Sequence, residues 1–184
     1  MSKRIRSGSI VLAGAVGALL VTAGVGRAAK VGDVLTSPEL RDASDQPTTI
    51  PDFGSKVVAI FYNDADEADM NDPLADAIKA KNFDEKLYRG LGIANLADSK
   101  APNFLIRKII RGKIEKYNSV ILTDPDRLLP KAWDLGDCNN TSVFILVGAD
   151  RQVKHVQRGP IRGADIDHIV GMIAKLIEAP TAAR

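Results

Sequence analysis

The chain of 184 residues is 45% hydrophobic and 26% charged, an ordinary composition for a globular protein with a hydrophobic core. Its one cysteine, Cys138, excludes an intramolecular disulfide and a cysteine-rich zinc site. The formal net charge of +2 becomes −2 when residues 1–28 are set apart, because they carry four basic and no acidic side chains. The remaining chain therefore gives no electrostatic reason to expect nucleic-acid binding.

The first 28 residues have the pattern of a secretory signal peptide. A basic start precedes an apolar run at residues 10–25, and small residues lead to Ala28. We expect cleavage after Ala28, which leaves residues 29–184 as one periplasmic domain that meets the membrane only during export. The alternative is an uncleaved anchor in the inner membrane, although the run is short for a span of about 20 residues.

The next part of the chain predicts short strands, a long strand and a helix. Residues 30–53 are polar and proline-containing, which favours one or two short strands with turns. Residues 56–63 form a continuous apolar run rich in Val and Ile, typical of a strand buried on both faces. Asp72 is then predicted to cap a helix that has Pro73 in its first turn.

A second strand and an amphipathic helix follow. Residues 89–98 are a strand candidate, weakened by Gly90 and Gly92. Residues 102–117 predict a helix whose apolar positions are Phe104, Ile106, Ile109, Ile110 and Ile114. The basic residues of this helix are expected to form a solvated face, with a surface for an acidic partner as the alternative. They are Arg107, Lys108, Arg111 and Lys113.

The last part of the chain predicts a strand, a hairpin and a helix. Residues 119–126 predict a buried strand with a turn, and residues 127–140 a short irregular or helical link. A hairpin is expected from strands at 142–147 and 153–158, followed by a helix over 163–179. The order predicts an α/β fold in which a parallel sheet with crossover helices gains an antiparallel edge. A mixed sheet flanked by helices in this order is the thioredoxin-like arrangement.

Two segments carry a more specific resemblance. "KVVAIFYNDADEAD" resembles the strand and loop that carry Cys-x-x-Cys in secreted thioredoxin-like oxidoreductases, and "TSVFILVGADRQVKHVQRGPI" resembles their later hairpin. With the signal peptide, "VGD", "LADAIKAKNF" and "SVILTDPDRLLPKAWDL", the chain is similar to the YtfJ-type periplasmic thioredoxin-like family. Its hairpin turn, "GADRQ", departs from the Asp-x-x-Gly turn common in that family.

The resemblance implies that the redox positions have lost their thiols. Counted from the strand, these positions fall on Asp66 and Asp69; counted from Pro73, they fall on Ala65 and Ala68. Exchange by a dithiol needs a low-pKa thiolate and a second, resolving cysteine, so we do not expect this activity.

The resemblance also implies that the cis-proline, which in thioredoxin-like proteins follows a Thr at the start of the hairpin, is replaced. Its position falls on Ser142, which follows Thr141. Because a cis peptide bond without proline costs about 3 kcal/mol, we expect a trans bond here.

Cys138 is the one residue that could support a single-thiol activity of the peroxidase type. Its neighbours Asp134 and Asp137 are expected to raise the pKa of the thiol. We therefore favour an inert or partly buried cysteine.

The loop "DADEADMND" contains the candidate functional residues Asp64, Asp66, Glu67 and Asp69. The spacing fails the EF-hand pattern, because Ala68 occupies a ligand position. A looser metal site formed by Asp64, Asp66 and Asp69 is an alternative. Our preferred interpretation is that these carboxylates cap a helix N-terminus.

These patterns favour an exported domain without a cofactor that binds a partner protein or peptide and performs no disulfide exchange. We expect any binding groove to lie between residues 64–69 and the loop 140–142, which includes Thr141 and Ser142. The alternative is an enzyme that uses Cys138 as a peroxidatic thiol or the acidic loop as a metal site. His155 and His168 are expected to be surface or half-buried, and Trp133 is expected to be a packing residue.

Overall fold

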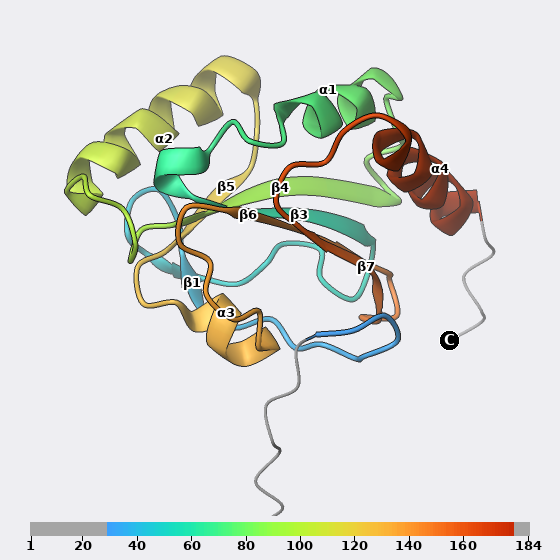
Figure 1. Ribbon diagram of the computed structural model, residues 1–184, viewed down its shortest axis with the longest axis horizontal. Coiled ribbons are helices and arrows are strands. Elements are labelled where there is room, and N and C mark those ends of the chain that lie inside the picture. The colour runs from blue at the N-terminus through green and yellow to red at the C-terminus, as the bar shows by residue number, and fades with distance from the viewer. Residues whose placement is uncertain (1–28, 179–184) are drawn as a thin grey trace, which may run out of the picture.

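The computed structural model describes residues 29–178 and is drawn in Figure 1. Seven strands form one mixed sheet in the order β2-β1-β5-β4-β3-β6-β7. The strands are β1 (Leu40–Arg41), β2 (Pro47–Thr48), β3 (Val57–Asp64), β4 (Tyr88–Asn95), β5 (Ile121–Asp124), β6 (Ser142–Val147) and β7 (Val153–Arg158). The helices are the 3-10 turn η1 (Ala65–Glu67), α1 (Asp72–Ala80), α2 (Asn103–Tyr117), α3 (Leu128–Trp133) and α4 (Ala164–Glu178). The expected signal peptide lies outside the described residues.

The sheet confirms the predicted mixed topology. Strands β3, β4 and β5 run parallel, whereas the β6–β7 hairpin and the two short strands pair antiparallel. Both hairpin strands have the predicted bounds. Helices α1, α2 and α4 cover one face of the sheet, and α3 with the N-terminal segment lies on the other (Figure 1). Within residues 29–178, no helix is long and apolar enough to cross a membrane.

Apolar side chains are buried on both faces of the sheet. On one face, Leu74 of α1 and Ile169 of α4 pack against alternate residues of β3 and β6. On the other face, Leu129 and Trp133 of α3 pack against the residues of β3, β4 and β5 that point the opposite way. This double burial explains why residues 57–60 are continuously apolar.

The N-terminal segment is bound to the late hairpin and to α3. Gly32 donates its N–H to the carbonyl of Val153, whose own N–H donates to the carbonyl of Asp33. Trp133 stacks on Phe53 and donates its indole N–H to the carbonyl of Thr36 at 2.9 Å. Trp133 is thus a packing residue, as predicted, and it helps to hold the beginning of the domain.

Three details differ from the predictions. Strand β3 continues to Asp64, which is therefore a buried strand residue and not a loop residue. Helix α1 begins at Asp72, but the residue at the N-cap is Asn71, whose side chain bonds elsewhere. In α2, Phe104 and Ile109 are exposed because the buried face is turned toward Ile106 and Ile110.

Candidate functional site

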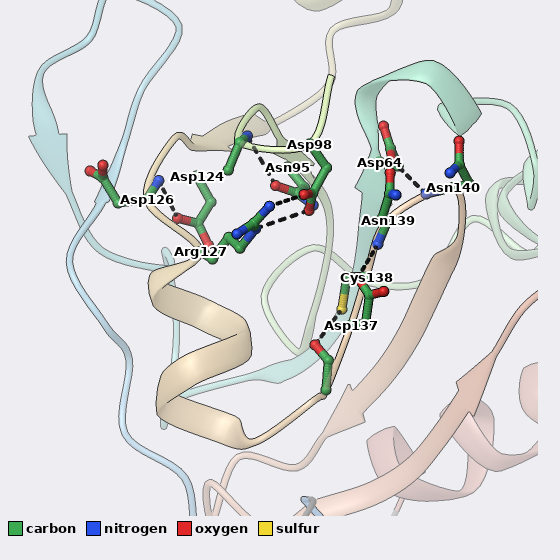
Figure 2. A network of polar contacts seen from close by, with 12 residues as sticks. Asp64, Asn95, Asp98, Asp124, Asp126, Arg127, Asp137, Cys138, Asn139 and Asn140 are labelled. Atoms are coloured by element: carbon green, nitrogen blue, oxygen red, sulfur yellow. Dashed lines mark hydrogen bonds and ion pairs between the residues drawn. The ribbon is translucent and has the colours of Figure 1, made fainter. Parts of the chain in front are cut away.

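The side chain of Asp64 joins the two loops that were expected to border a binding groove. One carboxylate oxygen accepts the N–H of Asp66 at 3.0 Å and so caps η1. The other accepts the N–H of Asn140 at 2.7 Å, and the N–H of Asp64 donates to the carbonyl of Thr141 at 2.9 Å. Figure 2 shows the contact between Asp64 and Asn140. Asp64 is fully buried, so it holds the loops together and is not itself available to a ligand.

Asn71 makes a second connection between these loops. Its amide nitrogen donates to the hydroxyl of Ser142 at 2.9 Å and to the carbonyl of Gly159 at 3.1 Å. Its amide oxygen accepts the N–H of Ile161 at 2.8 Å. Asn71 does not cap α1 with its side chain, because that side chain is hydrogen-bonded to Ser142, Gly159 and Ile161. The hydroxyl of Ser142 in turn donates to the side-chain oxygen of Asn63.

The remaining candidate carboxylates face solvent. Asp66 and Asp69 are exposed and Glu67 is half-buried. Asp66 accepts hydrogen bonds from the hydroxyl of Ser99 at 3.1 Å and the N–H of Lys100 at 3.4 Å, which tie it to the loop before α2. Among the described residues, no three His, Cys, Asp or Glu side chains are grouped so that they could hold a metal ion.

The Thr141–Ser142 peptide bond is trans, as predicted, because the described residues contain no cis bond. Ser142 is buried as the first residue of β6, and Thr141 is half-buried. Their neighbours Asn139 and Asn140 are exposed. On this loop, the side chains of Asn139 and Asn140 are therefore accessible to a ligand, whereas that of Ser142 is not.

A row of buried polar residues lies at the carboxyl ends of the three parallel strands. Asp64 of β3 pairs in register with Asn95 of β4, and Asn95 pairs with Asp124 of β5. All three are fully buried. The sequence interpretation missed Asn95 and Asp124, although each ends an apolar strand. The signal was present, since ligands of open α/β sheets bind beyond these strand ends.

Asp124 organises the start of α3. Its carboxylate accepts the N–H groups of Leu128 at 2.8 Å and Leu129 at 2.9 Å, and the hydroxyl of Tyr62 at 3.2 Å. Burial, aided by the nearby Asp124, raises the pKa of Tyr62 well above its ordinary value. Tyr62 therefore remains a neutral hydrogen-bond donor, and Asp124 has a structural role at this position.

An ion pair covers the outer side of the polar row. Arg127 donates to both carboxylate oxygens of Asp98, and the side-chain amide of Asn95 donates to Asp98 at 2.6 Å (Figure 2). The hydrogen bond from Arg127 lowers the pKa of Asp98. The carboxylate side chain is only 7% exposed, whereas the Arg127 side chain is 52% exposed.

Cys138 is buried directly before the Asn139–Asn140 loop. Its side chain belongs to the same apolar cluster as Tyr62 and Trp133. Its S–H donates to the carbonyl of Gly136 at 3.6 Å. The pKa of the thiol is raised, as expected from sequence, but burial is the main cause and Asp137 contributes less. The guanidinium of Arg158, 3.9 Å from the sulfur, acts in the opposite direction.

The two histidines lie away from this region. His155 of β7 is half-buried and His168 of α4 is exposed, as predicted. Their rings are 6.4 Å apart in an edge-to-face arrangement, a contact that the sequence interpretation did not anticipate.

Comparison with known proteins gives a family match and a fold. Residues 55–176 match the family model described as "Bacterial protein of unknown function (YtfJ_HI0045)". No curated protein matches the sequence.

Several solved structures share the fold. A thiol-disulfide isomerase from Corynebacterium glutamicum is 15% identical with a TM-score of 0.58, over 81% of this chain and 98% of that one. BsSco, of the Sco family of cytochrome c oxidase assembly proteins, is 14% identical with a TM-score of 0.58, over 83% and 98%. The exposed lipoprotein thioredoxin Etrx1 from Streptococcus pneumoniae is 13% identical with a TM-score of 0.57, over 77% and 100%. These likenesses establish a thioredoxin-like fold.

Proposed function

Because the chain belongs to the YtfJ_HI0045 family of bacterial proteins and has a thioredoxin-like fold, we propose that it binds a protein or peptide partner without exchanging disulfides. The periplasm is the proposed location, supported by the signal-peptide pattern of residues 1–28.

The observation that supports this function best is the pairing of the two loops through Asp64. It fixes exposed Asp66 and Asp69 on one side and exposed Asn139 and Asn140 on the other. Fixed carboxylates and amides supply hydrogen-bond acceptors and donors for a polypeptide, and the carboxylates favour a partner with basic side chains. Loops that are already hydrogen-bonded to each other lose less conformational freedom when a partner binds, which reduces the entropic cost of association.

The absence of thiols at the same place argues against disulfide exchange. The chain has a single cysteine, and Cys138 is buried beneath the loop with a raised pKa. A dithiol mechanism needs an accessible thiolate and a second thiol to resolve the mixed disulfide.

Charge reversal tests the proposed binding surface. Residues 29–184 carrying Asp66→Lys and Asp69→Lys should lose the proteins that the unaltered chain captures from periplasmic extract. The matched control carries Asp167→Lys and Glu178→Lys, which reverse two exposed carboxylates of α4. Capture that is unchanged in the first variant, or equally reduced in the control, would count against this surface.

A one-thiol peroxidase is the second candidate, favoured by the position of Arg158 near the sulfur of Cys138. A guanidinium stabilises a thiolate, and the thiolate is the species that a peroxide oxidises. Peroxide consumption that disappears in Cys138→Ser would support this activity. Consumption that persists in the variant and in the presence of a chelator would exclude both the thiol and the metal-assisted versions.

A further inference from the structure

The outer face of α2 is apolar where a surface helix is ordinarily polar. Phe104 is 67% exposed, Ile109 is 61% exposed and Leu105 is 44% exposed. Leu105 and Ile109 are four residues apart and are neighbours on the helix surface, and Phe104 lies in the first turn of α2. The buried contacts of α2 are made by Ile106 and Ile110, which pack with Ala43 and Leu96. None of the three exposed residues belongs to a hydrophobic cluster among the described residues.

Basic side chains surround this apolar face. Lys100, Lys108, Arg111 and Lys113 are all exposed. Arg111 is held by the carbonyl of Ala43, whereas none of the three lysines takes part in an ion pair among the described residues.

Within α2 the basic side chains outnumber the single carboxylate, Glu115. Beyond the helix, the nearby carboxylates are Asp66 of η1, which accepts the N–H of Lys100, and Asp72, whose pKa is influenced by Lys113 and by Asp69 and Asp76. The rest of the outer face of α2 carries no other carboxylate. An anionic partner is thus favoured over a cationic one.

The shape of the surface indicates the kind of partner. In Figure 1, α2 lies at the outside of the helical layer at one end of the sheet, and no other element covers its outer side. A single convex helix face with Phe, Leu and Ile beside Lys and Arg is the pattern of a helix that lies in a membrane interface. The lipid surface can deform around such a face, and lysine side chains can extend to the phosphates.

We propose that α2 docks the domain on an anionic membrane surface. Phe104, Leu105 and Ile109 enter the boundary between headgroups and acyl chains, while Lys108 and Lys113 contact lipid phosphates. This role is independent of partner binding at the Asp64–Asn140 loops, because it uses other residues on another element.

Vesicle binding tests the proposal. Residues 29–184, which contain every buried cluster described above, are mixed with vesicles of phosphatidylcholine alone or with an equal amount of phosphatidylglycerol, and bound protein is measured by co-sedimentation. Binding is expected only with phosphatidylglycerol and should weaken as salt screens the charges. Circular dichroism establishes that each variant is folded.

Two pairs of variants separate the apolar and the charged contributions. Changing Phe104, Leu105 and Ile109 to Ser should weaken binding at least about tenfold, whereas Val31→Ser with Val34→Ser, which alters equally exposed residues elsewhere, should not. Lys108→Gln with Lys113→Gln should weaken it about fivefold for each charge removed. Lys30→Gln with Lys175→Gln changes the net charge equally and should have little effect.

Several results would overturn the proposal. They are the absence of binding to phosphatidylglycerol vesicles, equal losses in the control variants, and lipid-free self-association that the three serines abolish. The last result would assign the apolar face to a second copy of the chain.

Discussion

The carboxylate of Asp64, buried at the end of β3, accepts the backbone N–H of Asn140 at 2.7 Å across a separation of 76 residues. This bond joins the loop that follows the central strand to the loop that precedes the hairpin. A buried side chain thus fixes the position of one loop relative to the other. Substitutions of Asp64 should therefore lower the stability of the protein more than substitutions of its exposed neighbours.

Asp64→Ala should lower the free energy of unfolding by about 2–4 kcal/mol, because it leaves the N–H groups of Asp66 and Asn140 without their acceptor. Urea denaturation measures the change. The exposed Asp69→Ala is the control and should stay within about 0.5 kcal/mol. Equal effects of the two substitutions would show that the buried contacts of Asp64 do not stabilise the loops.

Asn71→Asp should destabilise the protein by about 3 kcal/mol or more, although the two side chains have the same shape. A carboxylate cannot donate to Ser142 or to the carbonyl of Gly159, and it would be buried facing that carbonyl. Thermal melting compares this variant with Asn139→Asp, an exposed amide on the neighbouring loop. A similar melting temperature for both variants would contradict the assigned role of Asn71.

The Asp98–Arg127 pair should make stability depend on pH in the acid range. The folded-state pKa of Asp98 is lowered by Arg127, so the pair stabilises the protein above the ordinary aspartate pKa of about 3.9. This contribution is lost as the pH falls through the lowered folded-state pKa. Arg127→Ala should therefore be less stable than the unaltered protein at neutral pH, and the difference should shrink on acidification. A difference that stays constant with pH would refute this assignment; Lys79→Ala serves as the control.

Cys138 should react slowly with thiol reagents in the native protein. Burial shields the sulfur of Cys138 from reagents in solution and also raises the pKa of its thiol. Near neutral pH the thiol is therefore poorly accessible and only a small fraction of it is thiolate. The labelling rate in the folded protein should be at least about a hundredfold below that in urea and should rise as the pH increases past the ordinary thiol value of about 8.5. Rapid labelling of the folded protein at neutral pH would instead favour the peroxidase candidate.

The sequence was sufficient for the order of elements because each carries a local signal. The Val- and Ile-rich runs before Asp64 and at residues 142–147 depend only on neighbours in the chain. Asp64 itself was assigned to a loop, since a carboxylate after an apolar strand usually faces water. The burial of Asp64 depends on its contact with Asn140, and the residues around Asp64 in the sequence do not predict that contact.

Other residues could not be assigned from sequence for related reasons. Asn95 and Asp124 stand at the ends of predicted strands, a position that marks them as candidates, but their place beside Asp64 depends on strand pairing. Phe104 and Ile109 fitted a helical pattern, yet the side of α2 that becomes buried is chosen by the cluster around Leu96 and Ala43. Periodicity predicts that a helix has an apolar side, but tertiary packing decides how wide the buried part of that side is.

The N-terminal segment of the domain is hydrogen-bonded to the β6–β7 hairpin, and this has a consequence for folding during synthesis. Gly32, Asp33 and Leu35 leave the ribosome early, but their hydrogen-bond partners at Arg151 and Val153 are among the last residues to be made. The N-terminal segment must therefore wait, unpaired, until nearly the whole chain exists.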